Sequence, residues 1–143
     1  MLQCVGDDQM KWQALQNNPR VELINRYFAD GGYARQIEAT DAMLLPYRRS
    51  SYNLRVSRVV IESMIHGLPV MATQGTTLAS QAEEYGAAIP CEDGDAASLV
   101  TAIHKMEQQF ADLKGHAEQQ AQKCREHFSV RHFREIIIGQ PMG

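Results

Sequence analysis

One stretch of the chain, residues 41–73, constrains the fold more than any other. It consists of a short apolar run closed by Pro46, a loop with three arginines, a helical segment and a second apolar run. Ser57 precedes the helical segment and Gly67 follows it, and these residue types commonly begin and end helices. The first amides of a helix have no partner within the helix and lie at the positive end of its dipole. The stretch therefore predicts an anion site between a strand and a helix.

The loop before this helix, residues 46–56 and here called the arginine loop, carries groups suited to phosphate. Arg48, Arg49 and Arg55 supply guanidinium groups that bind phosphate oxygens through paired hydrogen bonds. A solvated basic loop is the simpler explanation, but three arginines so close together are unusual in a chain of net charge -3. We expect at least one phosphate contact, with Arg55 as the first candidate.

Short apolar runs alternate with helical segments, which is typical of a parallel sheet with helices on both faces. We expect strands at residues 2–5, 21–24, 42–45, 70–73 and 87–91. We expect helices at residues 10–16, 33–39, 56–66, 77–85, 96–113, 117–128 and 130–138. The unbroken apolar run at 42–45 predicts a strand covered on both faces. Because ligands bind beyond the carboxyl ends of such strands, the arginine loop is well placed for a site.

The composition is that of one ordinary globular domain, with 143 residues, 44% of them hydrophobic and 22% charged. The net charge of -3 gives no reason to expect a nucleic-acid partner. No apolar run approaches the roughly 20 residues that a transmembrane segment needs. Cys4, Cys91 and Cys124 are odd in number and far apart, which indicates reduced thiols in a cytoplasmic protein and argues against disulfide and zinc sites.

The ordered residues of this region resemble those of a known enzyme family. The pattern comprises Asp41, Pro46, Tyr47, Tyr52, Arg55, Ser57, Glu62, Gly67, Pro69 and Val70. It resembles the C-terminal, donor-binding domain of group 1 glycosyltransferases of GT-B architecture, over about residues 2–130. The resemblance implies a single Rossmann-like, doubly wound α/β domain over residues 1–143, with 114–143 as a helical tail. Compared with the family, the chain resembles a domain truncated at its N-terminus.

The resemblance implies a hexosyl transfer from a nucleotide-diphosphate sugar to an acceptor, as in polysaccharide or glycan biosynthesis, without an obligatory metal or other cofactor. Basic side chains and helix-terminal amides would stabilise the leaving diphosphate. By position, Arg55, Val56, Ser57 and Arg58 would bind the donor phosphates, and Glu62 would bind the ribose. Weaker implied contacts to the base or the sugar are Asn25, Arg26, Tyr27, Tyr52, Gly75 and Thr76. No catalytic residue is assigned.

Two departures from the family pattern limit this implication. Leu54 stands where many members carry an acidic residue that contacts the donor sugar. The first strand–helix unit, with its usual Arg and Lys, and the N-terminal acceptor domain are missing. We therefore expect the chain alone to bind a donor without catalysing transfer. The missing unit would expose a sheet edge suited to homo-oligomerisation, and the full-length enzyme could attach peripherally to a membrane.

The main candidates also have simpler structural explanations. Ser57 is expected to cap its helix whatever the function. Glu62 lies four residues after Arg58, and such a surface ion pair contributes only about 0.3–0.5 kcal/mol. Tyr47 and Tyr52 more often pack a loop onto a domain than contact a ligand.

Two other functions fit parts of the sequence. Residues 4–8 are similar to the acidic strand end of a phosphate-receiving signalling domain. That function needs an aspartate at the end of the apolar strand, where Pro46 and Tyr47 stand, and a lysine after a later strand, where residues 90–92 stand, so it is the least favoured. A non-catalytic nucleotide-binding or regulatory α/β module would keep the same fold and stays an alternative.

Overall fold

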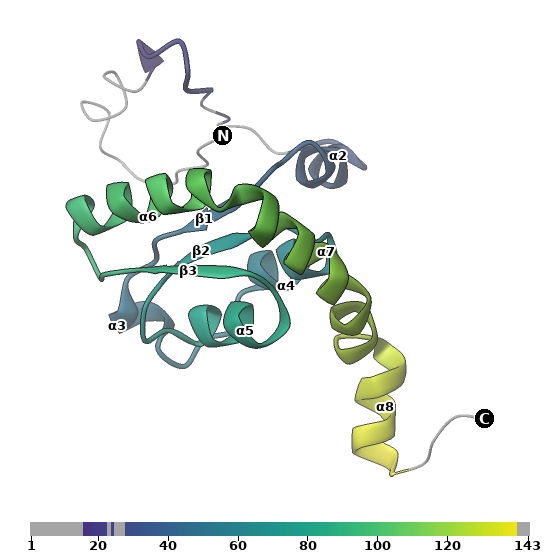
Figure 1. Ribbon diagram of the computed structural model, residues 1–143. Helices are drawn as coiled ribbons and strands as arrows, with labels where there is room; N and C mark the ends of the chain where they lie inside the picture. Colours follow the sequence, from purple (N-terminus) through teal and green to yellow (C-terminus); the bar gives the residue numbers. More distant parts are fainter. Residues whose placement is uncertain (1–15, 23, 25–27, 140–143) are drawn as a thin grey trace. The chain divides into compact units, whose positions relative to one another are not determined.

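The computed structural model describes residues 16–22, 24 and 28–139 (Figure 1). The chain divides into two compact units, residues 1–35 and 36–143. The predicted strand at 2–5 and all but the last residue of the predicted helix at 10–16 lie outside the described residues. The predicted strand at 21–24 is wrong at its described residues 21, 22 and 24. The Val21 amide instead closes a turn by donating to the Asn18 carbonyl at 2.9 Å.

A parallel sheet forms the centre of the second unit. Its strands in the described residues are, in spatial order, β1 (Met43–Leu45), β2 (Val70–Thr73) and β3 (Ala88–Cys91). Helices α4 (Arg58–Ile65) and α5 (Thr77–Tyr85) cover one face, and α6 (Ala96–Gln108) covers the other (Figure 1). The short helix α2 (Gly32–Glu38) precedes β1. The predicted α/β fold, with a parallel sheet between two helical layers, is confirmed.

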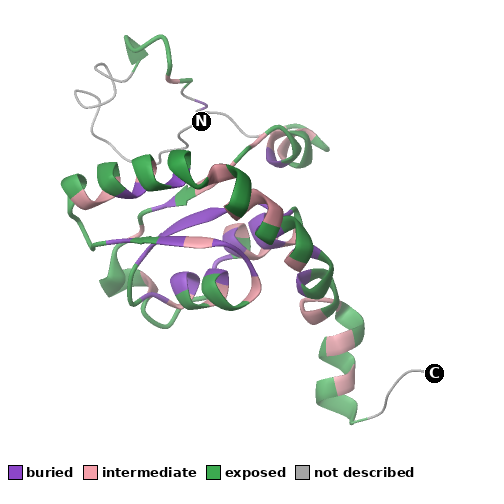
Figure 2. Ribbon diagram, viewed as in Figure 1, coloured by how far each residue is buried: buried purple, intermediate pink, exposed green. Residues whose placement is uncertain are grey.

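The central strand β2 separates two apolar clusters. Val70 and Ala72 belong to the cluster beneath α4 and α5, whereas Met71 belongs to the cluster beneath α6. This division follows from the alternation of side chains along a strand. All four residues of β2 are buried (Figure 2). The expectation that the strand at 42–45 is covered on both faces is wrong at Leu44, which is 45% exposed because α6 packs on β2 and β3.

The boundary between the first two C-terminal helices lies earlier in the chain than predicted. α6 ends at Gln108, and α7 (Phe110–His127) begins two residues later, so no single helix covers 96–113. At Gln109 the backbone leaves helical geometry, with φ -109° and ψ 13°. The predicted gap between the helices, residues 114–116, lies inside α7. The break lets α7 pack against α4 and α5, so tertiary packing overrides the local sequence signal.

Two cations of α7 bind the carboxyl end of α4. Lys114 Nζ donates to the Gly67 carbonyl at 2.9 Å, and Arg125 Nη1 donates to the Ile65 carbonyl at 2.6 Å. The last carbonyls of a helix have no partner within the helix and lie at the negative end of its dipole. α7 therefore donates hydrogen bonds to carbonyls at the C-terminal end of α4, which lies opposite the predicted anion site.

The last helix, α8 (Val130–Ile138), begins as predicted. The Ser129 hydroxyl accepts a hydrogen bond from the His132 amide at 3.1 Å, and Gly139 ends the helix with φ 67°. No residue of α8 is buried. Among the described helices, none combines the length and the apolar character that crossing a bilayer requires.

We predict that a side chain at position 67 destabilises the folded protein. Its φ is 65°, and a Cβ there would lie 3.0 Å from the Cα of Glu118. We expect Gly67→Ala to lower the free energy of unfolding by about 1–3 kcal/mol, because alanine is strained at positive φ and meets backbone. Gly115→Ala is the matched control, since nothing lies within 4 Å of its Cβ position inside a helix. There alanine should stabilise by about 0.5–1 kcal/mol. Urea denaturation distinguishes the two, and a loss of equal size in both would contradict the prediction.

Candidate functional site

The candidate site lies at the carboxyl edge of the sheet, where all three described strands end. Because the strands are parallel, the segments after β1, β2 and β3 leave this same edge. The Gln74 amide donates to the Cys91 carbonyl at 2.9 Å, which joins the segments after β2 and β3. The Thr77 hydroxyl donates to the Asn53 carbonyl at 2.9 Å, which joins the arginine loop to α5. The arginine loop therefore lies where the sequence predicted.

The arginine loop is partly ordered by a short helix, α3 (Arg49–Tyr52). Tyr47 precedes this helix and Tyr52 is its last residue, and their rings stack with centroids 4.4 Å apart and an interplanar angle of 18°. Both rings pack against the cluster beneath α4 and α5. Burial, with a smaller effect of Tyr52, raises the pKa of Tyr47. The tyrosines thus anchor the loop to the domain, and a ligand contact by Tyr52 stays a prediction.

The N-terminus of α4 lacks the side-chain cap that the sequence predicts. Ser57 occupies the predicted N-cap position, with an extended backbone at φ -113° and ψ 123°. Its hydroxyl makes no capping hydrogen bond, so the expected side-chain cap is wrong. Ser57 is only 7% exposed, and we attribute the missing cap to the packing of this side chain. The first-turn amides of α4 therefore receive no hydrogen bond from Ser57 and point toward the carboxyl edge.

Glu62 forms the ion pair that its spacing from Arg58 predicts. Arg58 Nε and Glu62 Oε1 lie 2.6 Å apart, and the two side chains are 85% and 20% exposed. Side chains on a helix lean toward its N-terminus, so the Glu62 carboxylate reaches back over the first turn. Arg58 therefore fixes a carboxylate beside the N-terminus of α4. The ribose contact of Glu62 stays a prediction.

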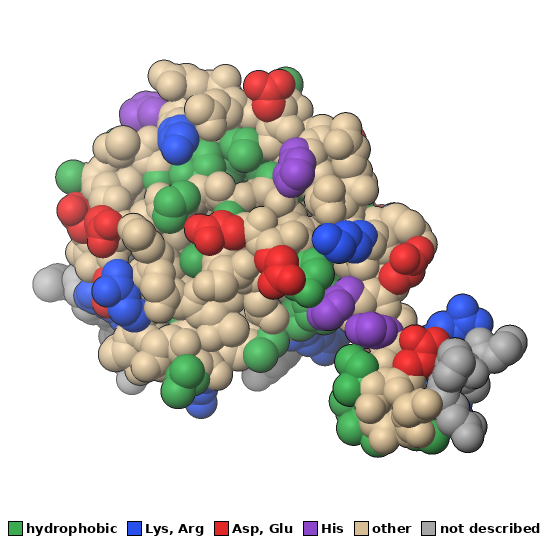
Figure 3. Space-filling model, turned by 60° about the horizontal axis from the view of Figure 1, so that its bottom comes forward, with side chains coloured by type: hydrophobic (Ala, Val, Ile, Leu, Met, Phe, Trp, Pro, Cys, Tyr) green, Lys and Arg blue, Asp and Glu red, His purple; other side chains and the backbone are tan. Residues whose placement is uncertain are grey.

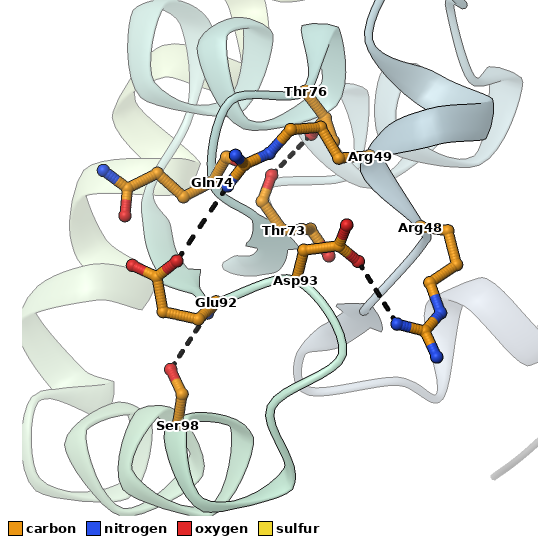
Figure 4. A network of polar contacts seen from close by, with 8 residues as sticks. All are labelled: Arg48, Arg49, Thr73, Gln74, Thr76, Glu92, Asp93 and Ser98. Atoms are coloured by element: carbon orange, nitrogen blue, oxygen red, sulfur yellow. Dashed lines mark hydrogen bonds and ion pairs between the residues drawn. The ribbon is translucent and has the colours of Figure 1, made fainter.

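The three arginines of the loop differ in their surroundings, and Figure 4 shows two of them, Arg48 and Arg49, with their partners. Arg48 Nη1 lies 3.7 Å from Asp93 Oδ1, and Arg49 Nη2 lies 3.9 Å from Glu92 Oε2. Arg49 Nε also donates to the Gln74 carbonyl at 3.0 Å. Arg55 is exposed and has no hydrogen bond or ion pair to the described residues. The positive charge of Arg55 is therefore the least compensated of the three.

Glu92 and Asp93 are the residues of this edge that sequence reasoning did not assign to the site. The signal lay in their position, because acids that directly follow β3 share an edge with arginines that follow β1. The side chains in these pairs are 31–69% exposed, so each pair contributes at most about 1 kcal/mol. Their main effect is to hold Arg48 and Arg49 between neighbouring loops.

The structure describes only some of the residues that are predicted to contact the base or the sugar more weakly. Gly75 has a φ of 72° and packs beneath Arg49. Thr76 is buried, and its hydroxyl both accepts from the Ala79 amide at 3.2 Å and donates to the Thr73 carbonyl at 2.6 Å. The side chain of Thr76 is therefore engaged in capping α5. Asn25, Arg26 and Tyr27 lie outside the described residues, so their predicted contacts stay predictions.

Within the described ranges, no group of three or more His, Cys, Asp or Glu side chains is arranged to hold a metal ion. Cys91 and Cys124 are free and buried. Burial is the main cause that raises the pKa of each thiol. The Cys124 thiol also donates to the Tyr85 carbonyl at 2.6 Å. These cysteines are therefore protonated packing residues at neutral pH.

Comparison with known proteins agrees with this arrangement. The family model described as glycosyl transferases group 1 matches residues 1–109, which is more than half of the chain. The match includes the arginine loop, α4 and the segments after all three strands, and it ends where α6 gives way to α7. No curated protein and no solved structure matches the chain significantly. The chain belongs to the group 1 glycosyl transferase family.

Proposed function

We propose that this chain binds a nucleotide-diphosphate sugar as the donor for glycosyl transfer. One observation carries the proposal: the N-terminus of α4, which the Ser57 side chain does not cap, faces the carboxyl edge of a parallel sheet beside an arginine loop. Helix N-termini of this kind bind phosphate through amides and dipole together. Membership of the group 1 family supports a sugar donor as the ligand. In this proposal, residues 1–143 form the donor domain, with 114–143 as its helical tail.

The diphosphate would lie over the first turn of α4. Amides of Val56, Ser57 and Arg58 and the Ser57 hydroxyl would donate to its oxygens, and Arg55 would add a positive charge. Arg48 and Arg49 already pair with carboxylates and would contribute less. Negative charge grows on the diphosphate as its bond to the sugar breaks, so the same donors would stabilise the leaving group.

The ribose would lie beside Glu62, whose carboxylate Arg58 holds near the end of α4. Tyr52, Gly75 and Thr76 would contact the base or the sugar, and Thr76 would do so through its backbone because its hydroxyl is engaged. Asn25, Arg26 and Tyr27 are the remaining candidates for the base. The donor site serves only one of the two substrates of a transfer reaction. We therefore propose that the chain alone binds the donor without completing the transfer.

Calorimetric titration with UDP, GDP and ADP sugars tests the proposal. We expect saturable binding of at least one donor and binding of the matching nucleoside diphosphate at the same site. Circular dichroism recorded on the same sample establishes that the chain is folded. A folded chain that binds none of these ligands would refute the donor site.

Arg55→Ala should weaken binding of the nucleoside diphosphate by roughly tenfold or more, since a hydrogen bond to a charged group contributes about 1.5–3 kcal/mol. Tyr47→Phe should change the affinity little, because it removes a hydroxyl and no charge. The affinity lost in Arg55→Ala should also shrink as salt is raised. Equal effects of the two substitutions would contradict the role of Arg55 as a phosphate clamp.

A further inference from the structure

Arg49 joins the segments that leave the three strands at the carboxyl edge of the sheet. It belongs to the arginine loop after β1, and its Nε donates to the Gln74 carbonyl after β2 at 3.0 Å. Its Nη2 lies 3.9 Å from Glu92 Oε2 in the segment after β3. Figure 4 shows its guanidinium group beside Gln74, with Glu92 below it. Figure 3 shows acidic and basic side chains close together at the left of the molecule, the side on which Figure 1 places α3. One side chain of the arginine loop therefore contacts both neighbouring segments.

The turn between β2 and α5, residues 74–76, packs against the guanidinium group of Arg49. Gly75 has a φ of 72°, and a Cβ there would lie 3.1 Å from Arg49 Nε and 3.4 Å from Arg49 Cζ. Glycine at this position therefore lets the guanidinium group approach the backbone of the turn closely. Lysine would keep the charge, but it has neither a planar group nor a donor at the Nε position. The contact therefore depends on the shape of arginine as well as on its charge.

Hydrogen bonds fix the two ends of turn 74–76 and leave a donor in its middle. The Gln74 amide donates to the Cys91 carbonyl at 2.9 Å, and the Thr76 hydroxyl donates to the Thr73 carbonyl at 2.6 Å. Gly75 lies between them and is exposed, and its amide has no hydrogen-bond acceptor among the described residues. Sugar hydroxyls accept hydrogen bonds from such amides. The Gly75 amide is therefore available to a ligand at this edge.

Turn 74–76 lies beside the N-terminus of α4. Helices α4 and α5 pack on the same face of the sheet and against each other, and both begin at the carboxyl edge. The Thr77 hydroxyl donates to the Asn53 carbonyl at 2.9 Å, so the start of α5 is joined to the loop that leads into α4. In the proposed function, the diphosphate lies over the first turn of α4. A sugar attached to this diphosphate can therefore extend toward turn 74–76.

We propose that Arg49 is a positioning residue, which holds turn 74–76 so that the Gly75 amide binds the sugar of the donor. This inference rests on the proposed function and assigns the sugar, rather than the base, to the turn. Glu92 offsets the charge of Arg49, so Arg49 acts on the sugar through the turn and adds little to diphosphate binding. A turn that is ordered before the ligand arrives lowers the entropic cost of binding.

Hydrogen exchange of the chain without ligand tests the positioning role. The Gln74 amide, bonded to the Cys91 carbonyl, and the Ala79 amide, bonded to the Thr76 hydroxyl, report on the two ends of the turn. We expect both amides to exchange about threefold faster or more in Arg49→Lys, because the contact that holds the turn is lost. Unchanged exchange at these two amides would overturn the positioning role.

Calorimetric titration with paired probes tests the assignment of the sugar. The pairs are UDP-glucose with UDP, GDP-mannose with GDP, and ADP-glucose with ADP. In the pair that binds, Arg49→Lys should weaken the nucleotide sugar about fivefold and the free diphosphate less than about twofold. Arg55→Ala should weaken both members of the pair, because the diphosphate is common to them. A role of Arg49 in the stability of the domain alone would not change the ratio of the two affinities.

Arg48→Lys is the matched control. Arg48 belongs to the same loop, but its ion pair is with Asp93, at 3.7 Å. The substitution keeps the charge and should leave both the exchange of the turn and the ratio of the two affinities unchanged. An unchanged ratio in Arg49→Lys, with diphosphate binding intact, would overturn the sugar assignment and leave the proposed donor site standing. A folded chain that binds no probe would refute the donor site and, with it, the sugar contact.

Discussion

Replacing Leu78 by alanine should lower the free energy of unfolding by about 2–5 kcal/mol. Leu78 lies in α5, is fully buried and packs in the cluster between α4, α5 and the sheet. Removing its branched end leaves a cavity, because the sheet on one side and the helix backbones around it cannot collapse freely. The loss is a large share of the about 5–15 kcal/mol that stabilises a typical domain.

Leu54 supplies the matched control for this substitution. It is the same residue type but is 88% exposed in the arginine loop, so Leu54→Ala should change stability by less than about 0.5 kcal/mol. Urea denaturation followed by circular dichroism gives both values. If Leu78→Ala does not fold, Leu78→Met keeps most of the volume and should cost less than about 1.5 kcal/mol. Similar losses in Leu78→Ala and Leu54→Ala would refute the description of this core.

Replacing Glu62 by alanine should weaken donor binding by roughly 10- to 100-fold, which corresponds to the loss of charged hydrogen bonds to the ribose. The Arg58–Glu62 contact holds the carboxylate beside the N-terminus of α4. A carboxylate that merely paired with Arg58 on the surface would contribute only about 0.3–0.5 kcal/mol to stability and nothing to affinity. Donor titration of the variant therefore separates the two roles, while its stability should change little.

A second ion pair of the same kind provides the control for Glu62. Glu118 pairs with Lys114 four residues earlier, at 3.4 Å, in α7 and away from the arginine loop. Glu118→Ala should leave donor affinity unchanged, and Glu62→Gln should retain part of it because an acceptor oxygen remains. The ribose assignment would be wrong if Glu62→Ala bound the donor as tightly as the unaltered chain.

The sequence predicted the segment from β1 to β3 well because its local signals agree. Pro46, Gly67 and Gly86 interrupt apolar runs at the points where strands and helices end. A buried central strand such as β2 needs apolar residues on both faces, and that pattern is visible without any neighbour. Local propensity and tertiary packing point to the same structure here, so prediction succeeds.

The errors lie where distant residues decide the outcome. The break at Gln109 has no glycine or proline signal and follows from the packing of α7 on α4 and α5. The Ser57 hydroxyl fits the cap pattern but does not cap. The partners of Arg48 and Arg49 come from a loop more than forty residues away, and only the parallel register of the sheet brings them together. Such contacts leave no periodic trace in the sequence.

The contacts of Lys114 and Arg125 with the carboxyl end of α4 give this helix an electrostatic asymmetry. Cations neutralise its negative end, whereas its positive end has no side-chain cap from Ser57. An anion at the N-terminus of α4 is attracted by the positive end of the helix dipole. Because cations compensate the negative end, that end repels the anion less. Both cations lie in α7, beyond residues 1–109 of the family match. A segment outside the matched residues therefore compensates the negative end of α4, about one helix length from the candidate site.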